Sequence, residues 1–154
     1  MGLPITRDTR RLHTAPQSAA SARAQSTGRR GAVSRARSTR LDLGRAGEKA
    51  AAELLRKRGY EVVGAGFTAR RGELDLVCRR AGELVVVEVK TRTSAAFGTP
   101  LEAVGSRKRR ALMAAAAEYR ALAHWRGPIR YAVVGLTVKP EGGFEAELVE
   151  DPFE

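Results

Sequence analysis

Two runs of apolar residues near the middle of the chain have the pattern of paired β-strands. Residues 72–78 and 83–90 are rich in valine and leucine, and a short polar segment that contains Gly82 separates them. Apolar and β-branched residues on both sides of a glycine-containing turn predict a β-hairpin. Charged residues interrupt both runs, at Asp75 and Glu88, where a hairpin that only builds a core would carry apolar side chains.

The remaining hydrophobic pattern predicts two helices and three further strands. Asp42 can cap a first helix that runs to about Arg58, and Ser106 can cap a second helix over about residues 107–123. The further strands are expected at about residues 60–66, 129–138 and 144–149. The order α-β-β-β-α-β-β predicts an α/β fold with a mixed central sheet flanked by helices.

Charge and composition divide the 154-residue chain into three parts. Residues 1–40 hold nine arginines and one aspartate, a net charge of +8, and have no hydrophobic period, so we expect a disordered basic tail. Residues 41–150 are expected to form one domain, and residues 151–154 an acidic, solvated end. The total net charge of +11 favours a polyanionic partner, with nucleic acid ahead of a membrane surface.

Cysteine and histidine usage excludes several classes of protein. Cys78 is the only cysteine, so no disulfide can form within the chain, and a cytoplasmic location is expected. The two histidines, His13 and His124, are isolated, so there is no zinc signature. No apolar run approaches the ~18 residues that a membrane span requires, so no insertion into a membrane is expected.

The register of the hairpin decides which charged side chains meet. If Ala81–Gly82 forms a two-residue loop, Asp75 lies opposite Glu88, and Glu73 lies opposite Lys90. Side chains alternate between the two faces of a strand, so all four would share one face. A three-residue loop would shift the register by one and separate the two carboxylates. The other face would hold Leu74, Leu76, Cys78, Val85, Val87 and Val89.

Two carboxylates that face each other repel, and a cation between them would remove this repulsion. Oxygen ligands suit Mg²⁺ or Mn²⁺, and Lys90 points from its strand toward the same place, where it can hold a water or a phosphate oxygen. Asp75, Glu88 and Lys90 are therefore candidates for metal-assisted phosphodiester hydrolysis. The alternative is a solvated, charged sheet face in which Glu73 and Lys90 form an ordinary ion pair.

Several basic residues near this hairpin are candidates for phosphate contacts. Arg70 and Arg71 precede the hairpin, and Arg92 follows it in a polar loop. Basic residues in the first turn of a helix oppose the helix dipole, which is reasonable if that turn meets a phosphate backbone. The second predicted helix begins with four of them: Arg107, Lys108, Arg109 and Arg110.

The motifs together resemble the YraN-type family of uncharacterised bacterial proteins. They are Leu43–Glu48, Gly72–Val77, Val86–Arg92, Phe97–Val104 and Lys108. This family is similar to the PD-(D/E)xK nuclease superfamily, which has the restriction-endonuclease-like fold, and to archaeal Holliday-junction resolvases. The resemblance covers about residues 41–136 and leaves out the basic tail.

The resemblance implies a role for each matching residue. Asp75 and Glu88 would be the metal carboxylates, the Val89 carbonyl would be a further ligand, and Lys90 would orient water or stabilise developing charge. Glu48 lies on the border of the apolar stripe of the first helix, where by itself it is an ordinary surface glutamate. The resemblance instead implies that it is an additional acidic residue of the site.

These observations predict a Mg²⁺- or Mn²⁺-dependent endonuclease that acts on DNA, including branched or damaged DNA. The alternatives are a nucleic-acid-binding protein without catalytic activity that keeps the nuclease fold, and a nuclease that cleaves RNA. A homodimer is expected only by analogy with the resolvases. A nuclease of this kind would reside in the bacterial cytoplasm, where it could associate with the nucleoid.

Overall fold

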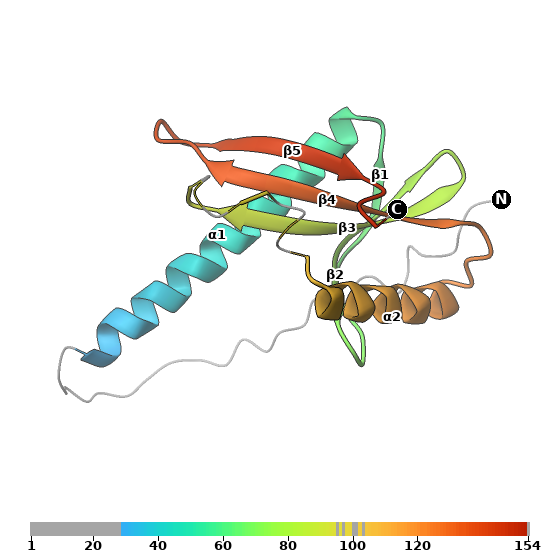
Figure 1. Cartoon of the computed structure of the whole chain (residues 1–154), viewed down its shortest axis with the longest axis horizontal. Helices are drawn as coiled ribbons and strands as arrows, with labels where there is room; N and C mark the ends of the chain where they lie inside the picture. Colours follow the sequence, from blue (N-terminus) through green and yellow to red (C-terminus); the bar gives the residue numbers. More distant parts are fainter. Residues whose placement is uncertain (1–28, 95, 97, 100–101, 103, 154) are drawn as a thin grey trace.

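The computed structural model describes residues 29–94, 96, 98–99, 102 and 104–153, which form a five-stranded sheet with one helix on each face (Figure 1). Among these residues, no helix combines the length and the apolar character needed to cross a membrane. The elements are α1 (Arg29–Lys57), β1 (Glu61–Thr68), β2 (Glu73–Arg80), β3 (Glu83–Arg92), α2 (Ser106–Leu122), β4 (Ile129–Val138) and β5 (Phe144–Glu150).

The strands lie in sequence order, and the sheet is mixed. β2 pairs antiparallel with β1 on one side and with β3 on the other, and β4 pairs antiparallel with β5. β3 and β4, which join these two groups, run parallel. A parallel pair needs a crossover connection, and α2 provides it. The predicted order α-β-β-β-α-β-β and the mixed sheet are confirmed, and the arrangement is consistent with a restriction-endonuclease-like fold.

The turn between β2 and β3 has the length on which the predicted register depends. Arg80 pairs with Glu83, so Ala81 and Gly82 form a two-residue loop, and both have positive φ angles, 50° and 79°. Two positive φ angles are typical of the type I′ turn, whose twist matches that of antiparallel strands. The loop therefore sets the register that brings Asp75 opposite Glu88.

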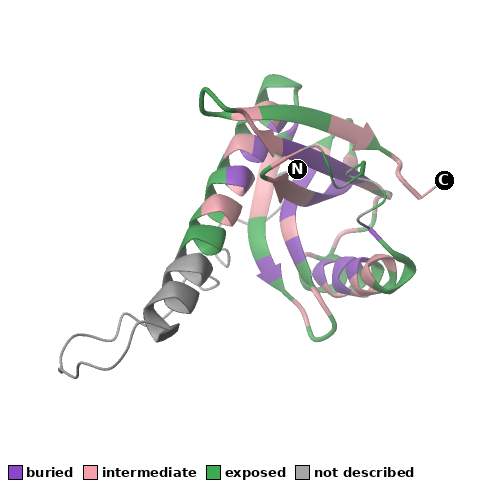
Figure 2. Ribbon diagram, turned by 60° about the vertical axis from the view of Figure 1, so that its left-hand side comes forward, coloured by how far each residue is buried: buried purple, intermediate pink, exposed green. Residues whose placement is uncertain are grey.

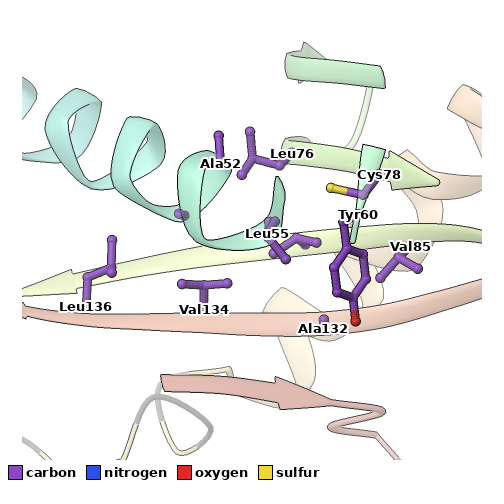
Figure 3. Close-up of a cluster of buried hydrophobic side chains, with 11 residues drawn as sticks. Ala52, Leu55, Tyr60, Leu76, Cys78, Val85, Ala132, Val134 and Leu136 are labelled. Carbon is purple, nitrogen blue, oxygen red and sulfur yellow. The ribbon is translucent and has the colours of Figure 1, made fainter. Parts of the chain in front are cut away.

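The first hydrophobic core lies between α1 and the sheet. It contains the face of the hairpin predicted to be apolar, apart from Leu74, together with α1 and β4 residues (Figure 3). Leu76, Cys78, Val85 and Val87 are buried here, and Val89 packs against them. Figure 2 shows that buried residues gather on the sheet and on parts of both helices. The predicted inward face is thus confirmed for these five residues.

The second core lies between the sheet and α2, and it contains Leu74. The prediction that Leu74 shares the face of Leu76 is wrong, because it packs with Phe67 in this second cluster. The end of the β1–β2 hairpin lies against α2: a Cβ on Gly72 would be 2.9 Å from the carbonyl oxygen of Ala111. This contact turns the end of β2 toward α2 and carries Leu74 with it.

Helix α1 begins at Arg29, not at Asp42 as the sequence predicted. Adding residues to an existing helix costs much less than nucleating one, and alanine and arginine favour helical conformation. The segment before Asp42 therefore continues the helix that is anchored on the sheet further along. The part of the predicted tail that covers residues 1–28 lies outside the described residues.

The structure corrects two other expectations, one at the start of α2 and one at the C-terminal end of the chain. Gly105, in extended conformation, is the N-cap of α2, with no side-chain hydrogen bond, and Ser106 is already helical. The acidic C-terminal end is packed rather than fully solvated: the Phe153 ring lies 5.6 Å from that of Tyr131, and Asp151 pairs with Arg130 at 2.9 Å. An aromatic residue next to the charges supplies the apolar contact that the acidic composition did not indicate.

Candidate metal centre

Strands β2 and β3 separate at the predicted site. Their paired residues run from Arg80 and Glu83 to Leu76 and Val87, and no backbone pairing continues beyond this point in the described strands. There Asp75 Oδ2 accepts a hydrogen bond from the Val89 backbone N–H at 2.8 Å. A side-chain carboxylate thus replaces a strand partner, and it is held in the fork between the two strands.

Glu88 lies beside this fork and is almost completely buried, with 2% of its surface exposed. Its Oε1 atom forms ion pairs with Lys90 Nζ at 2.9 Å and with Lys108 Nζ at 3.3 Å. Its Oε2 atom is buried and has no hydrogen-bond partner. A buried carboxylate oxygen without a partner loses its hydration without replacement, so this atom is well suited to a cation.

The carboxyl group of Asp75 lies near that of Glu88, whose negative charge acts on it. Burial and, after it, the negative charge of Glu88 raise the pKa of Asp75 to about 7, although the hydrogen bond from the Val89 N–H opposes the rise. Near neutral pH the Asp75 carboxyl group is therefore partly protonated, and a cation in place of this proton would relieve its repulsion with Glu88. Asp75 and Glu88 therefore lie close together, as the predicted register requires.

Glu48 reaches this region because α1 lies very close to β3. A Cβ on Gly47 would be only 2.0 Å from Thr91 Oγ1, so only glycine allows this approach. Burial raises the pKa of Glu48, and the charges of Glu73 and Glu88 act in the same direction while Arg45 opposes them. The charges of Glu73 and Glu88 thus act on the Glu48 carboxyl group, which distinguishes it from an ordinary surface glutamate.

A groove of about 560 Å³ adjoins the fork between α1 and the end of β3. Glu48 lines it on the helix side, and Lys90 and Arg92 line it on the strand side. The groove is open, and its lining combines these charged side chains with a larger share of apolar surface. It gives solvent access to the neighbourhood of Lys90.

The fork supplies two carboxylates as candidate metal ligands. In the described part of the chain, no group of three or more histidine, cysteine, aspartate or glutamate side chains is placed to hold a metal ion. Asp75 and Glu88 are two carboxylates, which matches Mg²⁺ sites that complete their coordination with water and substrate phosphates. Val89 adjoins Asp75 through its N–H, and the role of its carbonyl as a ligand stays a prediction.

The four basic residues at the start of α2 separate into three environments. Arg107 and Arg110 are exposed. Lys108 pairs with Glu88, and the Arg109 guanidinium lies 4.6 Å from the centre of the Phe153 ring. Lys108 and Arg109 are partly exposed, and the phosphate contacts of all four residues stay predictions.

The other predicted phosphate contacts lie at two loops. Arg71 is exposed at the β1–β2 turn, where the backbone N–H of Arg70 donates to Glu118 Oε2 at 3.0 Å. The Arg92 guanidinium donates to the carbonyl oxygens of Gly98 and Thr99 and so holds the loop that follows β3. Its contact with phosphate stays a prediction, as do those of Arg70 and Arg71.

Sequence reasoning missed the place of Lys108, although a signal was present. Lys108 lies four, seven and eleven residues before Leu112, Ala115 and Tyr119, all buried on the face of α2 that packs on the sheet. This spacing places Lys108 at the start of the buried stripe, so its charge points toward the sheet. Gly47 carried a similar signal, because glycine within a helix often marks a close contact.

Comparison with known proteins identifies the family of the chain. The model of the uncharacterised protein family UPF0102 matches residues 47–136, a segment that contains every acidic and lysine residue of the candidate site. A UPF0102 protein of Symbiobacterium thermophilum is 41% identical over 112 residues, which cover 72% of this chain and 95% of that relative. A UPF0102 protein of Clavibacter michiganensis is 47% identical over 103 residues, which cover 66% and 86% of the two chains. The chain therefore belongs to family UPF0102, which confirms the family resemblance drawn from its motifs.

Proposed function

We propose that this protein is a divalent-cation-dependent nuclease that hydrolyses phosphodiester bonds in DNA. The observation that carries the proposal is the fork between β2 and β3, where Asp75 and Glu88 meet and Glu88 Oε2 is buried without a partner. Two close carboxylates with an unsatisfied oxygen are destabilising in an ordinary sheet, and they are reasonable in a site built for a cation.

Each residue of the site has a separate task in this proposal. Asp75 and Glu88 would hold Mg²⁺ or Mn²⁺, and the Val89 carbonyl is a candidate for a further ligand. Such a cation polarises the scissile phosphate and makes an attacking water more acidic. Lys90 would orient that water or stabilise the charge that develops on the phosphate, and Glu48 would bind a water beside the cation.

Nucleic acid is the substrate class that the charge of the chain favours. The net charge is +11, and three exposed arginines, Arg71, Arg107 and Arg110, lie on the β1–β2 turn and on the N-terminal half of α2, which are in contact through Gly72 and Ala111. Contacts of this kind neutralise phosphates without reading bases, so binding should weaken steeply with salt and depend little on sequence.

A nuclease assay with matched variants tests the proposal. Plasmid DNA, branched DNA, linear duplex and single-stranded RNA are incubated with Mg²⁺ or Mn²⁺ and wild-type protein, Asp75→Asn, Lys90→Met or Lys139→Met. Lys139 is the control, because it lies in the β4–β5 turn and pairs only weakly, at 3.8 Å, with Glu141. We expect wild type and Lys139→Met to cleave, and we expect the cleavage rates of Asp75→Asn and Lys90→Met to be at least 100-fold lower. No protein should cleave in EDTA. Equal cleavage by all four proteins would mean contamination and would refute the proposal.

The second candidate function is nucleic-acid binding without catalysis. One observation favours it: Lys90 and Lys108 both pair with Glu88, so the charge of this carboxylate is already compensated without a metal. This candidate predicts salt-dependent binding of DNA or RNA that divalent cations do not change. RNA cleavage in the same assay would instead make RNA the substrate of the proposed nuclease.

A further inference from the structure

Lys108 is set apart from the other cations of its helical turn. Its Nζ lies 3.3 Å from Oε1 of a glutamate that is only 2% exposed, whereas Arg107 and Arg110 are exposed. The contact of Gly72 with Ala111 and the burial of Leu112 fix the start of α2 over the fork. The place of Lys108 is therefore determined by packing as well as by its ion pair.

Glu88 has two cationic partners on one oxygen atom. Lys90 and Lys108 both approach Oε1, at 2.9 and 3.3 Å, so two positive charges adjoin a single negative one. A divalent cation on the remaining oxygen, Oε2, would share the same carboxylate with both ammonium groups. The ammonium groups and a cation bound to the same carboxylate would repel each other appreciably even in a polar environment. The two lysines therefore oppose the binding of the cation that the carboxylates attract.

We propose that Lys108 is a residue of the metal site, where it competes with a bound divalent cation for the charge of Glu88. This inference rests on the proposed function for the presence of a metal, and it assigns Lys108 to the site rather than to the nucleic-acid backbone. The consequence is weak metal binding while no phosphate is present. A phosphate beside the fork offers Lys108 another anion, so substrate and metal favour each other's binding.

Titration calorimetry of the full chain with Mn²⁺ and with Mg²⁺ at pH 8, without nucleic acid, tests the inference. The variants are Lys108→Met, which keeps the length of the side chain and removes its charge, and Lys108→Arg, which keeps the charge. Arg110→Met is the matched control, because it removes an equal charge from an exposed position in the same turn. Thermal unfolding in EDTA establishes that each variant is folded.

We expect Lys108→Met to bind Mn²⁺ about tenfold more tightly than wild type, a difference of about 1.4 kcal/mol. Lys108→Arg and Arg110→Met should stay within about twofold of wild type. If Lys108→Met does not fold, Lys108→Gln replaces it in the same comparison with the same expected direction.

Two results would overturn the inference while leaving the proposed function intact. Unchanged affinity in Lys108→Met would place Lys108 outside the metal site, and weaker affinity would mean that it orients Glu88 instead of competing for it. A different result separates the two proposals: if wild type binds Mn²⁺ no better than Asp75→Asn does, the metal-dependent function is wrong and this inference is wrong with it.

Discussion

Replacing Asp75 by asparagine should stabilise the metal-free protein above neutral pH. The carboxylate is partly buried in the fork, near Glu88, and its pKa is raised from 3.8 to about 7. Asparagine is similar in size, its oxygen can still accept the Val89 N–H, and its amide can donate to the unpartnered Glu88 Oε2. The variant therefore removes a repulsion and can add a hydrogen bond.

The sign of the pH dependence follows from the raised pKa. The folded state holds a proton on Asp75 more tightly than the unfolded state does, so the stabilising contribution of this group is complete below the unfolded pKa of about 4. It is lost as the pH rises through the folded pKa of about 7. Wild type should thus lose stability relative to the variant between these two values, and the difference should level off above them.

The structure also bounds the magnitude of the effect. Each pKa unit corresponds to about 1.4 kcal/mol, so the rise from 3.8 to about 7 sets an upper limit of roughly 4 kcal/mol. Asp75 is only partly buried, so solvent screens part of the repulsion and reduces the cost. We expect Asp75→Asn to raise the free energy of unfolding by roughly 2 kcal/mol at pH 8 in EDTA.

Urea denaturation between pH 4 and pH 9 in EDTA measures this difference. Asp42→Asn is the control, because Asp42 is an exposed carboxylate on α1. A difference for Asp75→Asn that is zero, negative or the same at every pH would refute the reasoning from burial and repulsion. Adding Mg²⁺ should then stabilise wild type more than Asp75→Asn, because only the wild-type carboxylate pair offers two charges to the cation.

Three further predictions concern packing, the hairpin turn and the thiol. Gly47→Ala should destabilise the protein by about 1–3 kcal/mol in thermal or urea unfolding, because its Cβ would lie 2.0 Å from Thr91 Oγ1. Gly44→Ala is the control: its Cβ would have nothing within 4 Å, so this change should be neutral or stabilising. Equal effects of the two substitutions would contradict this account. Ala81→Gly should stabilise the protein by about 1 kcal/mol, because Ala81 has a φ angle of 50°, and a loss of stability would show that this angle is not strained. Burial raises the pKa of the Cys78 thiol to about 12, so the native protein at pH 8 should not react with a thiol reagent. The urea-unfolded protein should react at once. Rapid labelling of the native protein would disprove the burial of Cys78.

Much of the candidate site could be predicted from the sequence because it depends on local register. A two-residue loop at Ala81–Gly82 is enough to bring Asp75 opposite Glu88, and alternation along the strands then separates these carboxylates from Leu76 and Val87. Such relations hold within one hairpin, where only the loop length and the period of two are needed. The order of the elements was predictable for the same reason, since each run of residues carries its own period.

The sequence by itself determined the order of helices and strands and, for a two-residue loop, the facing carboxylates; the structure decided that the loop has this length. Only the tertiary structure decided that Lys108 pairs with Glu88, that Gly47 brings α1 against Thr91, and that Leu74 turns toward α2. These contacts join segments far apart in the chain, and their geometry depends on where each helix lies across the sheet. Packing of the whole core sets that position, and no local pattern contains it.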